Sequence, residues 1–232
     1  MANLDKRVKR IMVLDTETLD VEKPLIYDLA FTIIDKKGNV YAQKNWIIKE
    51  IFEQKERMQT AYYSKKLPLY DKMLQDGTAV LVPWEQVRTE LNGYLHHFDV
   101  SVISAYNLAF DKRAITYTNK CLGGKRKFLT KKVELWDIWG IAVQTIFQQK
   151  TFHKMALKYN WYSDKGNVIT NAEIGYKYIT NDIDFIESHT ALKDTEIEWK
   201  ILTRCLKQNK KMENGKGIFP APWRIAQKNK LK

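Results

Sequence analysis

The residues Ile11-Met12-Val13-Leu14 form an unbroken apolar run that leads directly into two acids, Asp15 and Glu17. An apolar run without alternation is typical of a strand buried on both faces, so a layer must cover each side of its sheet. Residues i and i+2 of an extended chain point the same way, which predicts that the two carboxylates face one side. Such acids repel each other unless cations lie between them, and Mg²⁺ and Mn²⁺ prefer these oxygen ligands. A single D-x-E pair, however, is more often surface charge at a strand end.

Another acid, Asp111, follows a second apolar stretch. Residues 100–105 predict a strand, and Tyr106-Asn107-Leu108-Ala109-Phe110-Asp111 then predicts a short loop and the first turn of a helix. An acid in a first turn is also explained by its favourable interaction with the helix dipole. Asp111 alone therefore leaves a structural and a metal-binding interpretation open.

The third segment contains His189 and Asp194, five positions apart. On one continuous helix five residues turn through about 500°, which leaves the two side chains roughly 140° apart. His189 is therefore predicted in the loop before a helix, with Thr190 as its N-cap and Asp194 on the helix itself. A histidine alone is more often a surface residue. With the four acids present, an imidazole with an ordinary pKa of about 6.5 suits a general base.

The sequences DTET, YNLAFD and HTALKD, in this order, resemble the three motifs of the DEDDh (DnaQ-like) 3′–5′ exonucleases. This family includes proofreading subunits, RNase T and oligoribonuclease. The motifs span residues 15 to 194, which is most of the chain. Two positions depart from the family without removing a catalytic group: Asp20 stands where relatives often have glycine, and Tyr106 where many have histidine.

The resemblance implies a site for two divalent ions, Mg²⁺ or Mn²⁺, and a catalytic role for five residues. Asp15 would bridge the two ions. Glu17 and Asp194 would complete the site of the first ion, and Asp111 would hold the second ion directly or through water. His189 would take the proton from the attacking water.

The resemblance also implies how substrate binds. The backbone around Thr16 and Thr18, together with the Leu19 side chain, lies where the terminal nucleotide binds in the family. Asn107 would support the loop of the second motif.

The apolar pattern predicts an α/β fold, which the resemblance specifies as a ribonuclease H-like mixed five-stranded β-sheet flanked by α-helices. Residues 26–34 and 40–48 flank a turn that contains Gly38 and Asn39, which predicts a hairpin. Further strands are predicted at 100–105 and 133–136, and helices at 84–98, 111–121, 138–147, 152–159, 171–178 and 190–207.

Length and composition fit one domain, predicted over residues 1–212, followed by a basic C-terminal tail at 213–232. A chain of 232 residues with 44% hydrophobic content can bury a full core. The two cysteines, Cys121 and Cys205, offer no disulfide framework. The first ten residues lack an apolar signal region, and no stretch approaches 18 consecutive apolar residues. We therefore expect a cytoplasmic protein without a membrane partner.

A formal net charge of +12 favours a polyanionic partner, although it can also merely aid solubility. The excess is largest near the C-terminus, where lysines and arginines from Arg204 onward accompany a single acid, Glu213. Such a tail could bind a phosphate backbone, or it could merely limit aggregation, and the two interpretations are about equally favoured.

The sequence thus predicts a metal-dependent 3′–5′ exonuclease that releases nucleoside 5′-monophosphates from single-stranded ends by a two-metal mechanism. DNA is the favoured substrate because the pattern is closer to the proofreading type, and RNA is the alternative. A non-catalytic nucleic-acid-binding module on the same fold, or an adaptor acting through the basic tail, is the rival from another class. A proofreading role would require a polymerase or another replication protein as a separate partner.

Overall fold

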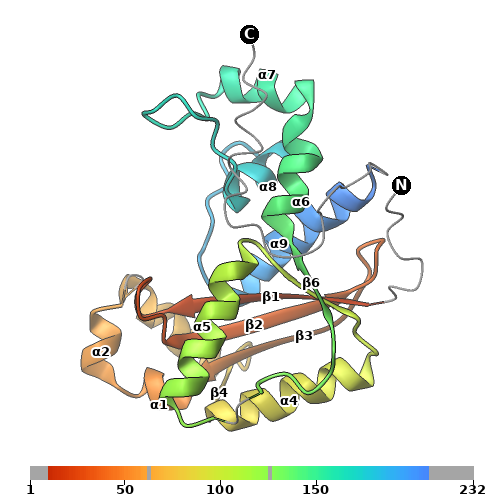
Figure 1. Cartoon of the computed structure of the whole chain (residues 1–232). Helices are drawn as coiled ribbons and strands as arrows, with labels where there is room; N and C mark the ends of the chain where they lie inside the picture. Colours follow the sequence, from red (N-terminus) through yellow and green to blue (C-terminus); the bar gives the residue numbers. More distant parts are fainter. Residues whose placement is uncertain (1–9, 62–63, 125–126, 209–232) are drawn as a thin grey trace.

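The computed structural model describes residues 10–61, 64–124 and 127–208. One mixed β-sheet lies between helices that cover both of its faces (Figure 1). Its strands are β1 (Ile11–Thr18), β2 (Ile26–Ile34), β3 (Val40–Ile48), β4 (Val80–Val82), β5 (Val102–Ala105) and β6 (Glu134–Asp137), in the order β4-β3-β2-β1-β5-β6. β2 is antiparallel to β1 and β3, whereas β5 is parallel to β1 and β6, and β4 is parallel to β3. The predicted α/β fold with a mixed sheet is confirmed.

The predicted count of five strands is wrong, because β4 adds a sixth strand at the edge of the sheet. β4 has three residues and pairs in parallel with the end of β3, from Trp46 opposite Val80 to Ile48 opposite Val82. Three residues are too few to show an alternating pattern or a sustained apolar run, so the sequence cannot distinguish this strand from a loop.

The helices are α1 (Lys49–Phe52), α2 (Lys55–Gln59), α3 (Leu67–Gln75), α4 (Trp84–His97), α5 (Leu108–Cys121), α6 (Ile138–Gln144), α7 (Lys150–Lys158), α8 (Ala172–Thr180) and α9 (Ala191–Leu206). Short 3₁₀ turns lie at Ser64–Lys66 and Ile146–Gln148. The predictions at 84–98, 152–159, 171–178 and 190–207 are confirmed to within two residues at each end. The helix predicted over 138–147 is shorter than expected, because α6 ends at Gln144 and a 3₁₀ turn follows.

The predicted hairpin between β2 and β3 is confirmed, and its turn is organised by Asp35. The Asp35 side chain accepts hydrogen bonds from the backbone N–H groups of Lys37 (2.8 Å) and Asn39 (3.1 Å). Gly38 has a φ of 91°, which glycine adopts without a steric penalty. A Cβ atom there would lie 3.1 Å from the side chain of Thr203, so the turn packs closely against α9.

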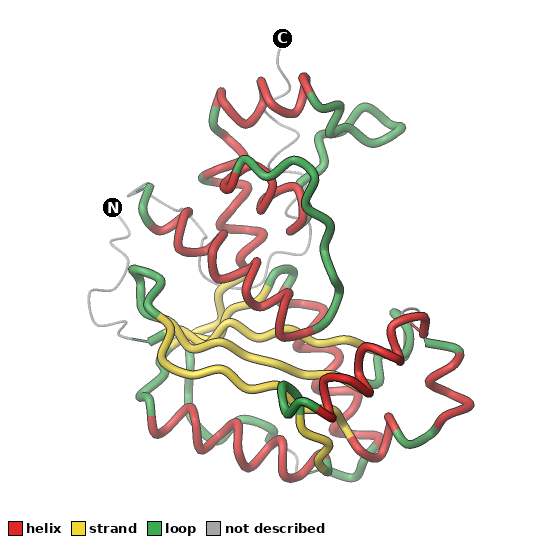
Figure 2. Tube along the Cα trace, turned by 180° about the vertical axis from the view of Figure 1, so that it is seen from behind, coloured by secondary structure: helices red, strands yellow, loops and turns green. Residues whose placement is uncertain are grey.

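The side chains of β1 alternate between two hydrophobic cores. Met12 and Leu14 belong to the core under α4 and α5, whereas Ile11 and Val13 belong to the core under α6 and α9. Figures 1 and 2 show α4 and α9 on opposite faces of the sheet. This burial on both faces confirms what the apolar run at residues 11–14 predicts. It also determines that Asp15 and Glu17, in step with Ile11 and Val13, face α9.

Some expectations fall outside the described residues, including the basic tail at 213–232 and the end of the domain predicted over 1–212. Within the described ranges, no helix is long and apolar enough to cross a membrane. The two cysteines are both free, with Cys121 exposed and Cys205 buried.

Candidate active site

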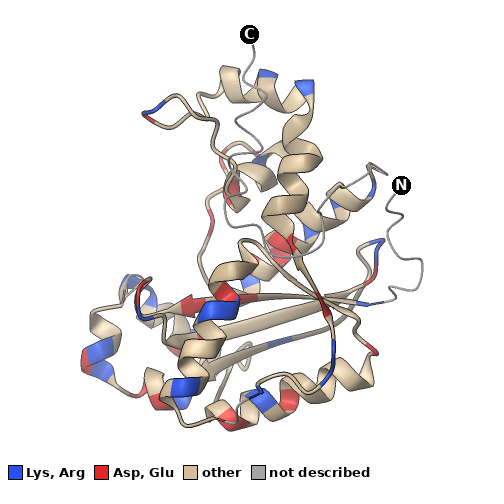
Figure 3. Ribbon diagram, in the orientation of Figure 1, with Lys and Arg blue, Asp and Glu red and all other residues tan. Residues whose placement is uncertain are grey.

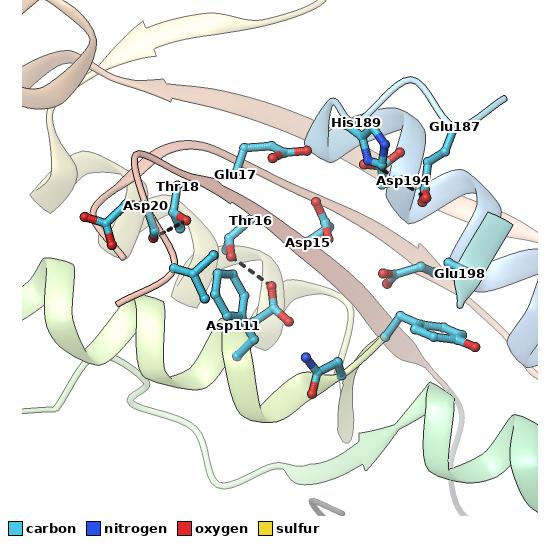
Figure 4. Close-up of a pocket in the computed structure, with 15 residues that line it drawn as sticks. Asp15, Thr16, Glu17, Thr18, Asp20, Asp111, Glu187, His189, Asp194 and Glu198 are labelled. Carbon is cyan, nitrogen blue, oxygen red and sulfur yellow. Dashed lines mark hydrogen bonds and ion pairs between the residues drawn. The ribbon is translucent and has the colours of Figure 1, made fainter. Parts of the chain in front are cut away.

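Asp15 and Glu17 lie on the C-terminal half of β1, beyond its last pair with β5 and beside α5 and α9 (Figure 4). A cavity of about 320 Å³ opens there. Its described lining comprises Asp15, Thr16, Glu17, Thr18, Asp20, Val21, Tyr106, Asn107, Phe110, Asp111, Ala172, Glu187, His189, Asp194 and Glu198. All five predicted catalytic residues are therefore brought together in one cavity, from three segments far apart in the sequence.

Asp111 lies in the first turn of α5, as predicted, although the helix begins three residues earlier than expected, at Leu108. Asn107 precedes the helix in a left-handed conformation, with φ 64° and ψ 48°, which asparagine tolerates better than most residues. The hydroxyl of Thr16 donates to Asp111 Oδ1 at 2.8 Å. Thr16 points away from its neighbours Asp15 and Glu17, so it joins β1 to α5 while the two acids face α9.

The start of α9 is held by a residue that the sequence does not single out, Asp28 on β2. Thr190 occupies the predicted N-cap position, but its side chain makes no capping hydrogen bond to the described part of the chain. Instead the N–H of Ala191 donates to Asp28 Oδ2 at 3.0 Å, and Tyr70 Oη donates to the same oxygen at 3.0 Å. Asp28 is fully buried and lies opposite Glu17 in the β1–β2 register. This contact fixes α9, and with it Asp194, relative to β1.

His189 lies in the loop before α9, as predicted, and its φ of 52° is unusual for a residue other than glycine. The Nζ atom of Lys66 contacts the carbonyl of Ser188 and donates to that of His189 at 3.2 Å, which holds this loop against the start of α3. His189 Nδ1 lies 3.9 Å from Glu187 Oε2. Burial, followed by the charge of Lys66, lowers the pKa of His189, so its imidazole is neutral at neutral pH.

Glu17, His189 and Asp194 form the tightest group of potential metal ligands in the described residues. One ligand atom from each lies within 4.8 Å of the other two. Burial and the charge of Asp194 raise the pKa of Glu17 well above its usual value. Burial and the charge of Glu187 raise the pKa of Asp194 to about 8, even though Lys66 acts in the opposite direction. Both shifts favour the protonated acids when no metal is bound, and a cation would compete with those protons.

Asp15 and Asp111 are the remaining two predicted acids of the cavity. Burial raises the pKa of Asp15 well above its usual value, and the charges of Glu198, Asp194, Asp111 and Glu17 raise it further. Burial likewise raises the pKa of Asp111 to about 7, although the hydrogen bond from Thr16 lowers it.

Two buried carboxylate oxygens in the cavity, Asp194 Oδ1 and Glu198 Oε2, have no hydrogen-bond partner among the described residues. An unpaired buried acceptor is costly, and a divalent cation supplies the missing partner. The residues present therefore fit a site for Mg²⁺ or Mn²⁺ ions.

Three of the four predicted substrate-binding residues line the cavity, and one does not. Thr16, Thr18 and Asn107 line the cavity, whereas Leu19 is only 9% exposed and packs in the core under α4 and α5. The apolar part of the lining comes from other residues, among them Val21, which is 63% exposed.

The two positions that depart from the family both lie at the cavity. Asp20 is exposed, and its side chain accepts a hydrogen bond from the N–H of Lys23 at 2.6 Å. Tyr106 donates its hydroxyl proton to the carbonyl of Thr170 and stacks on Trp139, with ring centroids 6.1 Å apart. Tyr106 is thus tied to the segment that precedes α8.

Sequence reasoning missed two acids of the cavity, Glu187 and Glu198. Burial raises the pKa of Glu187 to about 7. Glu198 is 3% exposed and lies four residues after Asp194, on the same face of α9. This i, i+4 spacing is the signal that could have identified Glu198.

No protein-family model matches the chain, and no curated protein matches it in sequence. Solved structures do match. Escherichia coli exonuclease I in complex with a dA16 oligonucleotide aligns with a TM-score of 0.55 and 14% identity, over 87% of this chain and 41% of that one. The chain therefore shares the α/β fold of this exonuclease structure. Exonuclease I from Methylocaldum szegediense aligns with a TM-score of 0.53 and 12% identity, over 88% of this chain and 42% of that one. The chain therefore spans less than half the length of these exonucleases.

Proposed function

We propose that this protein is a metal-dependent 3′–5′ exonuclease of the DEDDh type that acts on single-stranded nucleic acid, with DNA favoured. One observation carries the proposal: Asp15, Glu17, Asp111, Asp194 and His189 line one cavity in which buried carboxylate oxygens lack a partner among the described residues. A structural role does not account for this arrangement, because clustered buried acids destabilise a fold that gains nothing from them.

The acids would hold two divalent ions, Mg²⁺ or Mn²⁺, which when bound would stabilise the attacking and leaving oxygens of the phosphodiester. Asp15, central among the carboxylates, is the residue suited to bridge the two positions. Glu17 and Asp194 would hold one position, and Asp111 the other. Neutral His189 would accept a proton from the attacking water at a ring nitrogen, and Glu187, 3.9 Å from Nδ1, would stabilise the imidazolium that results.

The surface beside the cavity supports a polyanionic substrate. The exposed side of α5 carries Lys112, Arg113 and Lys120, which line a second hollow of about 380 Å³. Figure 3 shows Lys and Arg positions along this helix in blue. Arg113 donates to the carbonyl of Val21 at 3.0 Å, and Val21 lines the cavity of the acids. A phosphate backbone lying along α5 would therefore lead to the acids.

The comparisons support DNA as the substrate, since the Escherichia coli exonuclease I structures contain dA16 and dT13 oligonucleotides. RNA stays the alternative, because the acids build the same phosphodiester site for either sugar. A polymerase or another replication protein as partner also stays a prediction.

The test compares the wild-type protein with Asp15→Asn on 3′- and 5′-end-labelled single-stranded DNA and RNA, with Mg²⁺, Mn²⁺ or EDTA. Shortening from the 3′ end that requires metal is expected, with a loss of activity in Asp15→Asn on the order of 10³-fold or more. Asp71→Asn, on the exposed side of α3, is the matched control and should retain activity. Binding without cleavage under every condition would favour the non-catalytic module instead.

A further inference from the structure

Glu198 lines the cavity, but the proposed mechanism, which uses four acids and one imidazole, gives it no role. It follows Asp194 by one helical turn on α9 and is 3% exposed. Figure 4 shows its carboxylate pointing toward Asp15, on the side of the cavity away from Glu17. Glu198 therefore faces Asp15 and Asp111, the two acids that do not belong to the group of Glu17, His189 and Asp194.

The charges around Glu198 are of one sign. After burial, the charges that most raise the pKa of Glu198 are those of Asp111 and Asp194. Apart from burial, the charge of Glu198 raises the pKa of Asp15 the most, ahead of the charges of the three other motif acids, Asp194, Asp111 and Glu17. Like charges at this density need a cation between them.

Lys66 lies on the His189 side of the cavity and lowers the pKa values of Glu17 and Asp194. The charges that act most strongly on Asp15 and Glu198 are those of carboxylates. Negative charge is thus concentrated on the Glu198 side of the cavity, where a cation would offset it.

Hydrogen bonding gives independent support. Glu198 Oε2 is buried and has no hydrogen-bond partner among the described residues, while a bond from the backbone of Tyr106 serves the carboxylate and lowers its pKa. A buried acid with a purely structural role satisfies its oxygens within the protein, as Asp28 does with Tyr70 and Ala191. Glu198 instead keeps an unpaired buried oxygen in a residue that lines the cavity.

We propose that Glu198 is a fifth carboxylate ligand of this site, which holds a divalent cation together with Asp15 and Asp111. The inference rests on the proposed function and extends it, because the family motifs supply only Asp111 beside the bridging Asp15 at the second position. An added carboxylate increases the negative charge of that position. The second ion then binds at a lower concentration than Asp15 and Asp111 alone would allow.

The test is a titration of the full-length, metal-free protein with Mn²⁺, in which electron paramagnetic resonance reports the free ion. The wild type is expected to bind two ions. Glu198→Gln, which keeps the shape but removes the charge, should retain one and weaken the other by about 10- to 100-fold. Glu196→Gln is the matched control, because Glu196 lies on the same helix with a side chain 39% exposed and paired with Lys200. It should bind both ions as the wild type does.

Unfolding of the metal-free proteins shows whether Glu198→Gln folds, and removal of a repelled buried charge should leave its Tm unchanged or higher. If that variant does not fold, Glu198→Asp replaces it, since a carboxylate withdrawn by one methylene should also weaken the second ion. Two ions bound with wild-type affinities by the folded variant would overturn the role of Glu198 and leave the nuclease proposal standing. A wild type that binds no Mn²⁺ would overturn both.

Discussion

His189 has two chemical roles open to it at the scale of the single residue. Its ring lies within 4.8 Å of ligand atoms of Glu17 and Asp194, a distance that also suits a metal ligand. Its lowered pKa keeps the imidazole neutral, which both a base and a ligand require. The left-handed backbone and the Lys66 contacts hold the ring at the mouth of the cavity in either case.

Substitution of His189 by asparagine separates these roles. If His189 is the base, kcat should fall by about 10²- to 10⁴-fold while Mn²⁺ affinity stays within about twofold of wild type. A metal ligand would instead lose affinity and activity together. Single-turnover cleavage of labelled single-stranded DNA gives the rate, and the Mn²⁺ titration gives the affinity. A wild-type kcat in the His189→Asn variant would show that His189 takes no part in the mechanism.

The sequence identifies candidate catalytic residues only where a motif marks them. Asp15, Glu17 and Asp111 are recognisable because each lies close behind a clear apolar run, at residues 11–14 or 100–105. Glu198 lies inside an amphipathic helix, where an acid is normally solvated, so its burial depends on the position of α9 against β1. That position is set in part by Asp28, a contact between residues 163 apart in sequence, which local patterns do not reveal.

At the scale of the elements, α5 carries a buried acid and exposed basic residues on different sides. Asp111 is buried toward the acids, whereas Lys112 and Lys120 are exposed along the outer side of the same helix. The helical repeat places the acid and the lysines on different sides of α5, and this arrangement can be read from the sequence once the first residue of the helix is known. The sequence-based expectations do not include α1, α2 and β4, which have three to five residues each and are too short to show a pattern. They also omit α3, although Leu67, Tyr70, Met73 and Leu74 have helical spacing there.

The basic side of α5 predicts how binding depends on salt. Each phosphate contact that is lost should reduce the slope of log affinity against log salt by about 0.7 for a single strand. Lys112→Ala and Lys120→Ala should each do so, and should weaken binding at low salt. Fluorescence anisotropy with a labelled oligodeoxynucleotide in EDTA measures this without cleavage. Lys154→Ala, on the exposed side of α7, is the control. An equal effect in the control would show that only net charge matters.

At the scale of the whole molecule, the fold sets a cluster of acids between two hydrophobic cores. Asp15 and Glu17 lie on β1 beyond its last pair with β5, and α5 and α9 pack on opposite faces of the sheet. The apolar run at residues 11–14 predicts that both faces are covered, but not which helices cover them. The expected role of the basic tail at 213–232 stays a prediction.

The buried acids should make the stability of the metal-free protein fall as pH rises. The pKa values of Asp111 and Asp194 are raised to about 7 and about 8, so the folded state binds more protons than the unfolded state. The stabilisation is therefore present below the ordinary carboxyl pKa of about 4 and is lost as pH rises through the folded values. Each pH unit across which one group titrates changes the free energy of unfolding by about 1.4 kcal/mol.

We expect the Tm in EDTA to be lower at pH 8 than at pH 5.5 by roughly 3–5 °C or more. Mg²⁺ should raise the Tm more at pH 8 than at pH 5.5, because at the lower pH it must displace protons from the same carboxylates. Differential scanning calorimetry at both pH values, with and without Mg²⁺, measures the two effects together. Asp15→Asn should reduce both, since it removes the central carboxylate. A Tm in EDTA that rises with pH would contradict this account, because it would mean that the acids are ionised and stabilised without a metal ion.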